Sequence, residues 1–74
     1  MATVKIKRYW TGNVPTRDDF GKIIHTEFVD GKTKHGPWGF MTPLSYQLYG
    51  VGIGTGLGQR YKMQKDGKWL KVEG

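Results

Sequence analysis

The sequence predicts a mainly β fold: a small, strongly bent antiparallel sheet or partly open barrel of about five strands, with one short helix near residues 43–49. Three observations predict it. Residues 3–10 alternate between apolar and polar side chains, two Asp-Gly pairs separate strand-like segments, and MTPLSYQLYG carries the start and stop signals of a helix. A chain of 74 residues has room for one domain, so we expect a single domain over residues 1–74.

The core of such a domain depends on aromatic side chains. A domain of this size buries only roughly 60% of the surface that its unfolded chain exposes. The chain has no cysteine, so neither disulfides nor thiolate metal sites can supplement the core, whereas 3 Trp, 4 Tyr and 3 Phe each bring a large apolar area. Packing or oligomerisation therefore has to stabilise the fold.

The N-terminal segment has the two-residue period of a half-buried strand. One face should join the core, and the other should form a basic, aromatic surface. The residues expected to face the core are Val4, Ile6, Arg8 and Trp10. Those expected on the basic, aromatic surface are Lys5, Lys7 and Tyr9. Gly, Asn, Pro and paired Asp over residues 11–19 then predict a loop.

An Asp-Gly pair predicts the first hairpin, within residues 20–40. Asp30 and Gly31 favour the centre of a two-residue turn, where both residues need a positive φ. In that register Glu27 faces Lys34, and the two form an ion pair across the strands.

The predicted helix has recognisable ends. Thr42 suits the N-cap, Pro43 suits the first helical position, and Gly50 suits the stop. A helix of two turns is too short to be stable alone. We therefore expect Leu44 and Leu48, four residues apart, to pack on the sheet.

A second Asp-Gly pair, Asp66-Gly67, predicts a C-terminal hairpin with two possible registers. A two-residue turn pairs Met63 with Leu70, whereas a three-residue turn with a bulged glycine pairs Met63 with Trp69. The first register also gathers four side chains on one face: Lys62, Gln64, Trp69 and Lys71.

Glycine occupies every second position of GVGIGTGLG, residues 50–58. The favoured interpretation is a closely packed or barrel-corner strand whose bare face lets another group approach. The alternatives are a mobile loop and a loop that contacts a ligand such as phosphate. The stretch fits neither the G-x-G-x-x-G pattern nor the P-loop, so we do not expect a nucleotide-binding loop.

The charge of the chain favours polyanionic partners. Twelve Lys and Arg against 6 Asp and Glu give a net charge of +6. Basic and aromatic residues interleave in KIKRYW and RYKMQKDGKW, and aromatic faces stack on unpaired bases. The candidate nucleic-acid-binding residues are Lys5, Lys7, Arg8, Tyr9, Arg60, Lys62, Trp69 and Lys71. They form one surface only if the first and last strands are neighbours. In the alternative, Trp10 and Tyr61 are core residues and the lysines solvate edge strands.

Catalysis and metal binding are not expected. Ser45 lies in the predicted first helical turn, where local capping explains it, and Asp18 and Asp19 suit a solvated turn. A bulged first hairpin would place His25 opposite His35, but two ligands rarely hold a metal. We therefore predict no enzyme activity, no metal and no small-molecule cofactor.

The predicted function is a small binding module for single-stranded or structured nucleic acid, with DNA and RNA not distinguished. The alternative is a protein-interaction, accessory or inhibitor protein, self-associating or not, with no nucleic-acid role. The N-terminus lacks the apolar run of a signal peptide, and no stretch approaches the ~18 apolar residues of a membrane span. We expect a cytoplasmic protein with no membrane partner. The predicted architecture is similar to SH3-like and OB-like domains, a similarity that assigns no function.

Overall fold

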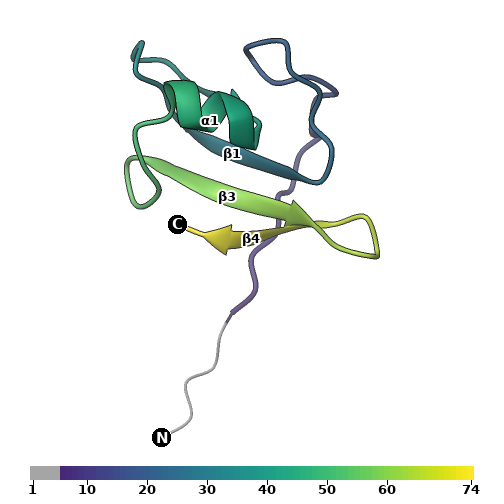
Figure 1. Ribbon diagram of the computed structural model, residues 1–74. Helices are drawn as coiled ribbons and strands as arrows, with labels where there is room; N and C mark the ends of the chain where they lie inside the picture. Colours follow the sequence, from purple (N-terminus) through teal and green to yellow (C-terminus); the bar gives the residue numbers. More distant parts are fainter. Residues whose placement is uncertain (1–5) are drawn as a thin grey trace, which may run out of the picture.

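The computed structural model, which describes residues 6–74, consists of an open antiparallel sheet and one short helix (Figure 1). In chain order the elements are β1 (Glu27–Lys32), β2 (Trp38–Met41), α1 (Pro43–Tyr49), β3 (Gly58–Met63) and β4 (Trp69–Glu73). The order in the sheet is β2-β1-β3-β4, so two hairpins meet along the β1–β3 pairing. The predicted mainly β fold with one short helix is confirmed.

The sheet has four strands rather than about five. Over residues 6–10 the predicted N-terminal strand is reduced to an isolated bridge between Tyr9 and Leu70. Ile6, expected in the core, is 76% exposed. Residues 3–5 of that prediction lie outside the described residues. Because residues 6–10 add no full strand, the sheet is open within the part of the chain that the structure describes.

The predicted turn at Asp30-Gly31 is wrong. Both residues lie inside β1, and β1 and β2 are joined by a turn at residues 33–37. There the N–H of Thr33 donates to the carbonyl of Pro37 at 3.0 Å, as does its hydroxyl at 2.8 Å. The hairpin itself was expected, but its turn lies several residues later in the chain.

Close approach of neighbouring strands explains the glycine inside β1. Gly31 pairs with Gly39 of β2 on one side and Gly58 of β3 on the other. A Cβ at Gly31 would lie 2.8 Å from the carbonyl oxygen of Leu57 and 2.9 Å from the Cα of Gly58. Tertiary contacts, rather than a positive φ, therefore require glycine at this position.

The second hairpin has the three-residue register. Met63 pairs with Trp69, and the N–H of Gln64 donates to the carbonyl of Lys68 at 2.7 Å. Gly67 has φ of +85°, the left-handed conformation that a bulged glycine supplies. The two-residue register is therefore wrong beside the turn, although a register shift between Arg60 and Tyr61 gives its predicted pairing of Arg60 with Glu73.

The glycine-rich stretch is a loop, and the favoured strand interpretation is wrong, since only Gly58 at its end begins a strand. Gly52, Gly54 and Gly56 have φ of +148°, +137° and +78°. The carbonyl of Gly54 accepts hydrogen bonds from the N–H groups of Leu57 and Gly58, both at 3.0 Å. Regular strand geometry does not permit these angles. Mobility and ligand contact of this loop remain predictions.

Helix α1 has the predicted start but the opposite orientation. Thr42 is the N-cap, and its hydroxyl accepts a hydrogen bond from the N–H of Ser45 at 3.3 Å. Leu44 and Leu48, expected to pack on the sheet, are each 52% exposed, whereas Ser45 is buried. The packing prediction for the two leucines is therefore wrong.

A buried carboxylate explains this orientation. Asp18 Oδ1 accepts the N–H groups of Phe20 and Lys22, both at 2.9 Å, and Oδ2 accepts the N–H of Thr42 at 2.8 Å and its hydroxyl at 2.9 Å. Burial alone would raise the pKa of Asp18, but hydrogen bonds from Ser45, Thr42 and Lys22 lower it. Asp18 is 5% exposed, so the expected solvated turn is wrong for this residue. Its carboxylate ties the segment over residues 16–24 to the start of α1.

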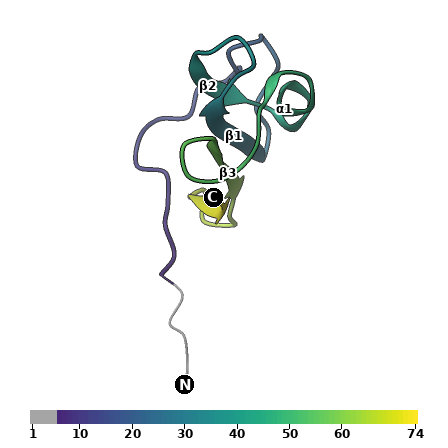
Figure 2. The same cartoon turned by 90° about the vertical axis from the view of Figure 1, so that its left-hand side faces the viewer.

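The two faces of the sheet are covered by different parts of the chain. Seen nearly end-on in Figure 2, the N-terminal segment passes one face and α1 lies against the other. Val29 and Met41 pair across β1 and β2 and are fully buried. The face opposite α1 carries five rings whose centroids lie 5.0–5.6 Å from their neighbours: Trp10, Phe28, Phe40, Tyr61 and Trp69. The alternative in which Trp10 and Tyr61 are core residues is confirmed for Tyr61, which is buried, whereas Trp10 packs against it half-buried.

Candidate nucleic-acid interface

The predicted interface required the first and last segments of the chain to be neighbours, and they are. The N–H of Trp10 donates to the carbonyl of Trp69 at 2.9 Å, and the N–H of Lys71 donates to the carbonyl of Arg8 at 2.8 Å. Trp10 enters the aromatic cluster, whereas Tyr9 is 39% exposed. The segment therefore presents one of its two aromatic rings to solvent.

Tyr9 is surrounded by lysines from both segments. The Nζ of Lys68 lies 5.7 Å from the centroid of the Tyr9 ring, within the range of a cation–π contact. Lys7 and Lys65 line a shallow hollow of about 390 Å³ together with Tyr9. We call Lys7, Tyr9, Lys65 and Lys68 the Tyr9 patch. One carboxylate, Asp66, borders the same hollow, so the three lysines leave a local excess of positive charge.

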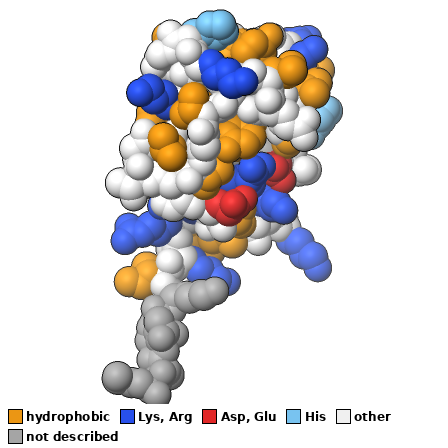
Figure 3. Space-filling view, turned by 60° about the vertical axis from the view of Figure 1, so that its left-hand side comes forward, with side chains coloured by type: hydrophobic (Ala, Val, Ile, Leu, Met, Phe, Trp, Pro, Cys, Tyr) orange, Lys and Arg blue, Asp and Glu red, His pale blue; other side chains and the backbone are white. Residues whose placement is uncertain are grey.

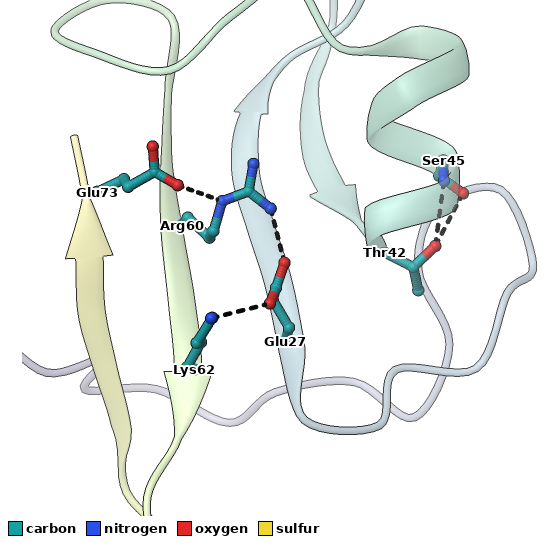
Figure 4. Close-up of polar contacts among 6 residues, drawn as sticks. All are labelled: Glu27, Thr42, Ser45, Arg60, Lys62 and Glu73. Atoms are coloured by element: carbon teal, nitrogen blue, oxygen red, sulfur yellow. Dashed lines mark hydrogen bonds and ion pairs between the residues drawn. The ribbon is translucent and has the colours of Figure 1, made fainter.

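Arg60 and Lys62 were predicted to contact nucleic acid, but they belong to an ion-pair network (Figure 4). Arg60 Nη1 and Nε lie 2.6 Å from carboxylate oxygens of Glu27 and Glu73, and Lys62 Nζ lies 3.7 Å from Glu27. Burial alone would lower the pKa of Arg60, but the two carboxylates raise it. The guanidinium also lies 5.3 Å from the centroid of the Tyr46 ring. These contacts connect three strands with α1, and Arg60 has little charge left to offer a ligand.

The register of the second hairpin divides the predicted interface between the two faces of the sheet. Lys62 pairs with Leu70, so both lie on the same face, and alternation places Trp69 and Lys71 on the other. Trp69 packs edge-on against the buried Phe28 at 5.0 Å. Its ring is half-buried in this contact, and stacking on a base would require it to leave.

Arg8 and Lys71 line a separate hollow of about 250 Å³, which Glu73 also borders. Tyr9 bridges Leu70, so alternation places Lys71 on the other face from Tyr9. Lys5 lies outside the described residues. On the side of the molecule shown in Figure 3, Lys and Arg side chains are spread over the whole height of the described chain, whereas acidic side chains occupy a small central area. This distribution fits attraction of a polyanion without defining one binding site.

The sequence analysis missed a second hollow with aromatic side chains in its lining. It has a volume of about 350 Å³, lies beside the 33–37 turn, and is lined by Phe20, His35, Pro37 and Trp38 together with the carboxylate-bearing Asp19. Trp38 is 48% exposed, and its Nε1 donates to Asp30 Oδ1 at 2.7 Å, which fixes the ring. The interleaved stretch GKTKHGPW was the available signal. The site was not recognised because a turn was wrongly predicted at residues 30–31.

The geometry around the remaining candidate groups is local. Ser45 contacts the N-cap of α1, as expected. His25 precedes β1 and His35 lies in the 33–37 turn, so the alternative that paired them across strands is wrong. Among residues 6–74, no three His, Cys, Asp or Glu side chains are grouped closely enough to hold a metal ion. Within the same residues, no helix has the length and apolar character needed to span a membrane.

Comparison with protein-family models, curated proteins and solved structures gave no match to this chain.

Proposed function

We propose that this protein is a small, non-catalytic module that binds nucleic acid, preferentially unpaired strands, at the Tyr9 patch. The observation that supports the proposal is an exposed tyrosine ring framed by three lysines and held by the pairing of the N-terminal segment with β4. Lysines attract phosphates irrespective of sequence, and the tyrosine face offers a stacking surface for a base. We place the protein in the cytoplasm, where such strands are available.

The revised set of residues differs from the one expected from sequence. Lys7 and Tyr9 remain in it, whereas Arg8 and Lys71 line a separate hollow and stay candidates outside the patch. Lys65 and Lys68 join it, whereas Arg60, Lys62 and Trp69 are left out because ion pairs and core packing occupy them. That list applies to residues 6–74, and Lys5 remains a candidate by prediction alone.

Salt dependence of binding tests the proposal. Three lysine–phosphate contacts predict that log K falls with log salt at a slope of about −2 for a single strand, at about 0.7 per contact. Fluorescence polarisation of labelled single-stranded DNA, single-stranded RNA and duplex DNA between about 50 and 200 mM salt measures this slope. We expect the combined change Lys65→Ala and Lys68→Ala to reduce its size by about 1.4.

A stacking variant and a matched control separate the patch from net charge. Tyr9→Leu removes the aromatic face and should weaken single-strand binding by about tenfold while leaving the duplex unaffected. The control, Arg17→Ala with Lys22→Ala, removes the same charge on another surface. If the control reduces binding as much as the patch variant, or if binding is insensitive to salt, the proposal is wrong.

The alternative role, interaction with another protein, is favoured by a separate observation, an apolar groove beside α1.

A further inference from the structure

A groove of about 560 Å³ lies between the segment over residues 16–24 and the start of α1. Its lining combines two kinds of side chain. The apolar members are Ile23, Pro43 and Leu44, and the basic members are Arg17, Lys22 and His25. The two walls are connected by the Asp18 carboxylate, whose hydrogen bonds reach both, so the groove is formed before any ligand arrives.

The apolar side chains on the floor of this groove are exposed to solvent, and the fold does not require that exposure. Ile23 is 45% exposed and Leu44 is 52% exposed. Helix α1 directs Ser45 toward the sheet and Leu44 outward, the reverse of the usual pattern for a helix packed on a sheet. Within the part of the chain that the structure describes, no element covers these two side chains.

The charge around the groove has one sign. Arg17, Lys22 and His25 line it, and no carboxylate belongs to its lining. The nearest acidic group along the chain, Asp18, is buried and uses both oxygens to accept hydrogen bonds from protein donors. The surface therefore complements a ligand that carries negative charge beside an apolar anchor.

We propose that the groove binds a short acidic segment of a partner protein, which places an apolar side chain between Ile23 and Leu44 and carboxylates against Arg17 and Lys22. Apolar insertion supplies affinity, and the basic lining selects acidic over basic segments. This surface is separate from the Tyr9 patch, and its occupation does not depend on nucleic-acid binding.

A second copy of this chain fits the groove poorly. The chain has 6 Asp and Glu, and the carboxylate of each accepts a hydrogen bond from its own chain. The residues concerned are Asp18, Asp19, Glu27, Asp30, Asp66 and Glu73. A second copy would therefore have to present carboxylates that already accept hydrogen bonds within its own fold. Nucleic acid fits poorly as well, because no Trp, Tyr or Phe ring belongs to the floor to stack on a base.

Selection from a phage-displayed library of random peptides against the full chain tests this proposal. We expect the enriched peptides to combine Asp or Glu with Leu, Ile, Phe or Trp. Synthetic peptides from this set, followed by fluorescence polarisation, should bind Leu44→Glu at least about tenfold more weakly than the unchanged protein. The matched control is Leu48→Glu, a leucine of equal exposure on the same helix outside the groove lining, which should change affinity less than about twofold.

Charge reversal provides a readout that misfolding would not mimic. Arg17→Glu with Lys22→Glu should lose the acidic peptide and gain a version in which Lys replaces its acidic residues. Leu44→Ser serves as a milder second variant, and thermal unfolding by circular dichroism checks that each variant is folded. The proposal is overturned if no peptide is enriched, if the enriched peptides are not acidic, if Leu44→Glu and Leu44→Ser bind like the unchanged protein, or if single-stranded DNA displaces the peptide.

Discussion

The tripeptide Asp-Gly-Lys occurs twice in this chain with two different structures. Asp66-Gly67 forms the turn of the second hairpin, with Gly67 at φ of +85°. Asp30-Gly31 lies inside β1, near its end, paired on both sides. The local preference for a turn decides the structure only where no neighbouring strand competes. In β1 two partner strands compete, and glycine serves close packing instead.

The largest effect that separates the two sites is expected from Gly31→Ala. The added Cβ would meet the backbone of Leu57 and Gly58 at less than 3.0 Å, and backbone on a central strand cannot easily move away. We expect a loss of about 3 kcal/mol in the free energy of unfolding, measured by urea denaturation. Gly12→Ala is the control, since its Cβ would meet only the Trp10 ring at an ordinary 3.4 Å. Equal stability of the two variants would show that the strands separate more easily than their spacing indicates.

The second-largest effect is expected at Asp18, whose carboxylate connects the segment over residues 16–24 to Thr42, just after the first hairpin. Asp18→Asn replaces one carboxylate oxygen by an NH₂ group, which would face the donors that this oxygen now accepts. We expect a loss of about 2 kcal/mol in the free energy of unfolding near neutral pH. Asp19→Asn is the matched control, because Asp19 Oδ2 accepts one N–H, that of Phe40, which an amide oxygen can replace. A larger loss for Asp19→Asn would contradict the assignment of the anchoring role to Asp18.

The stability difference between Asp18→Asn and the unchanged protein should also depend on pH. The pKa of Asp18 is lowered in the folded state, so its ionisation stabilises the fold fully above 3.8, the ordinary value, and that contribution is lost as pH falls through the lowered pKa. The difference should therefore be constant near neutrality and shrink under acid. A difference that grows on acidification would mean that the folded-state pKa is raised instead.

The smallest effect is expected at the second Asp-Gly site. Gly67→Ala places a Cβ on a residue with φ of +85°, where nothing lies within 4 Å, so strain acts without a clash. We expect a loss of about 1 kcal/mol by urea denaturation. Gly67→Asn should lose less, because asparagine tolerates the left-handed region. If Ala and Asn are equally unstable, the turn depends on something other than backbone conformation.

Features of the fold encoded by neighbouring residues were predictable. The ends of α1 and the second hairpin follow from local signals at Thr42, Pro43 and Asp66-Gly67. The orientation of α1 was not predictable, because the Asp18 carboxylate that fixes it lies 24 residues before Thr42 in the chain. The strand around Gly31 was missed for a similar reason, since its partners come from two other segments.

The candidate interface was predictable to a similar extent. Pairing between the two ends of the chain was the condition on which the predicted interface depended, and it brings Lys7 and Tyr9 beside the C-terminal hairpin. The ion pair of Arg60 was not predictable, because Glu27, its partner at 2.6 Å, lies 33 residues earlier. A pattern of basic and aromatic residues indicates composition on a surface, but ion pairs made at long range decide which charges remain free.

The β1–β3 pairing is the one long-range junction between the two hairpins of the sheet. Each hairpin joins strands that are close in sequence. Pairing β1 with β3 instead requires closure of a long loop that contains β2, α1 and the glycine-rich loop. An isolated two-stranded hairpin is marginally stable at best in water. The molecule is therefore indivisible: neither half is expected to persist as a folded fragment, and the slow step of folding is expected to be closure of this junction.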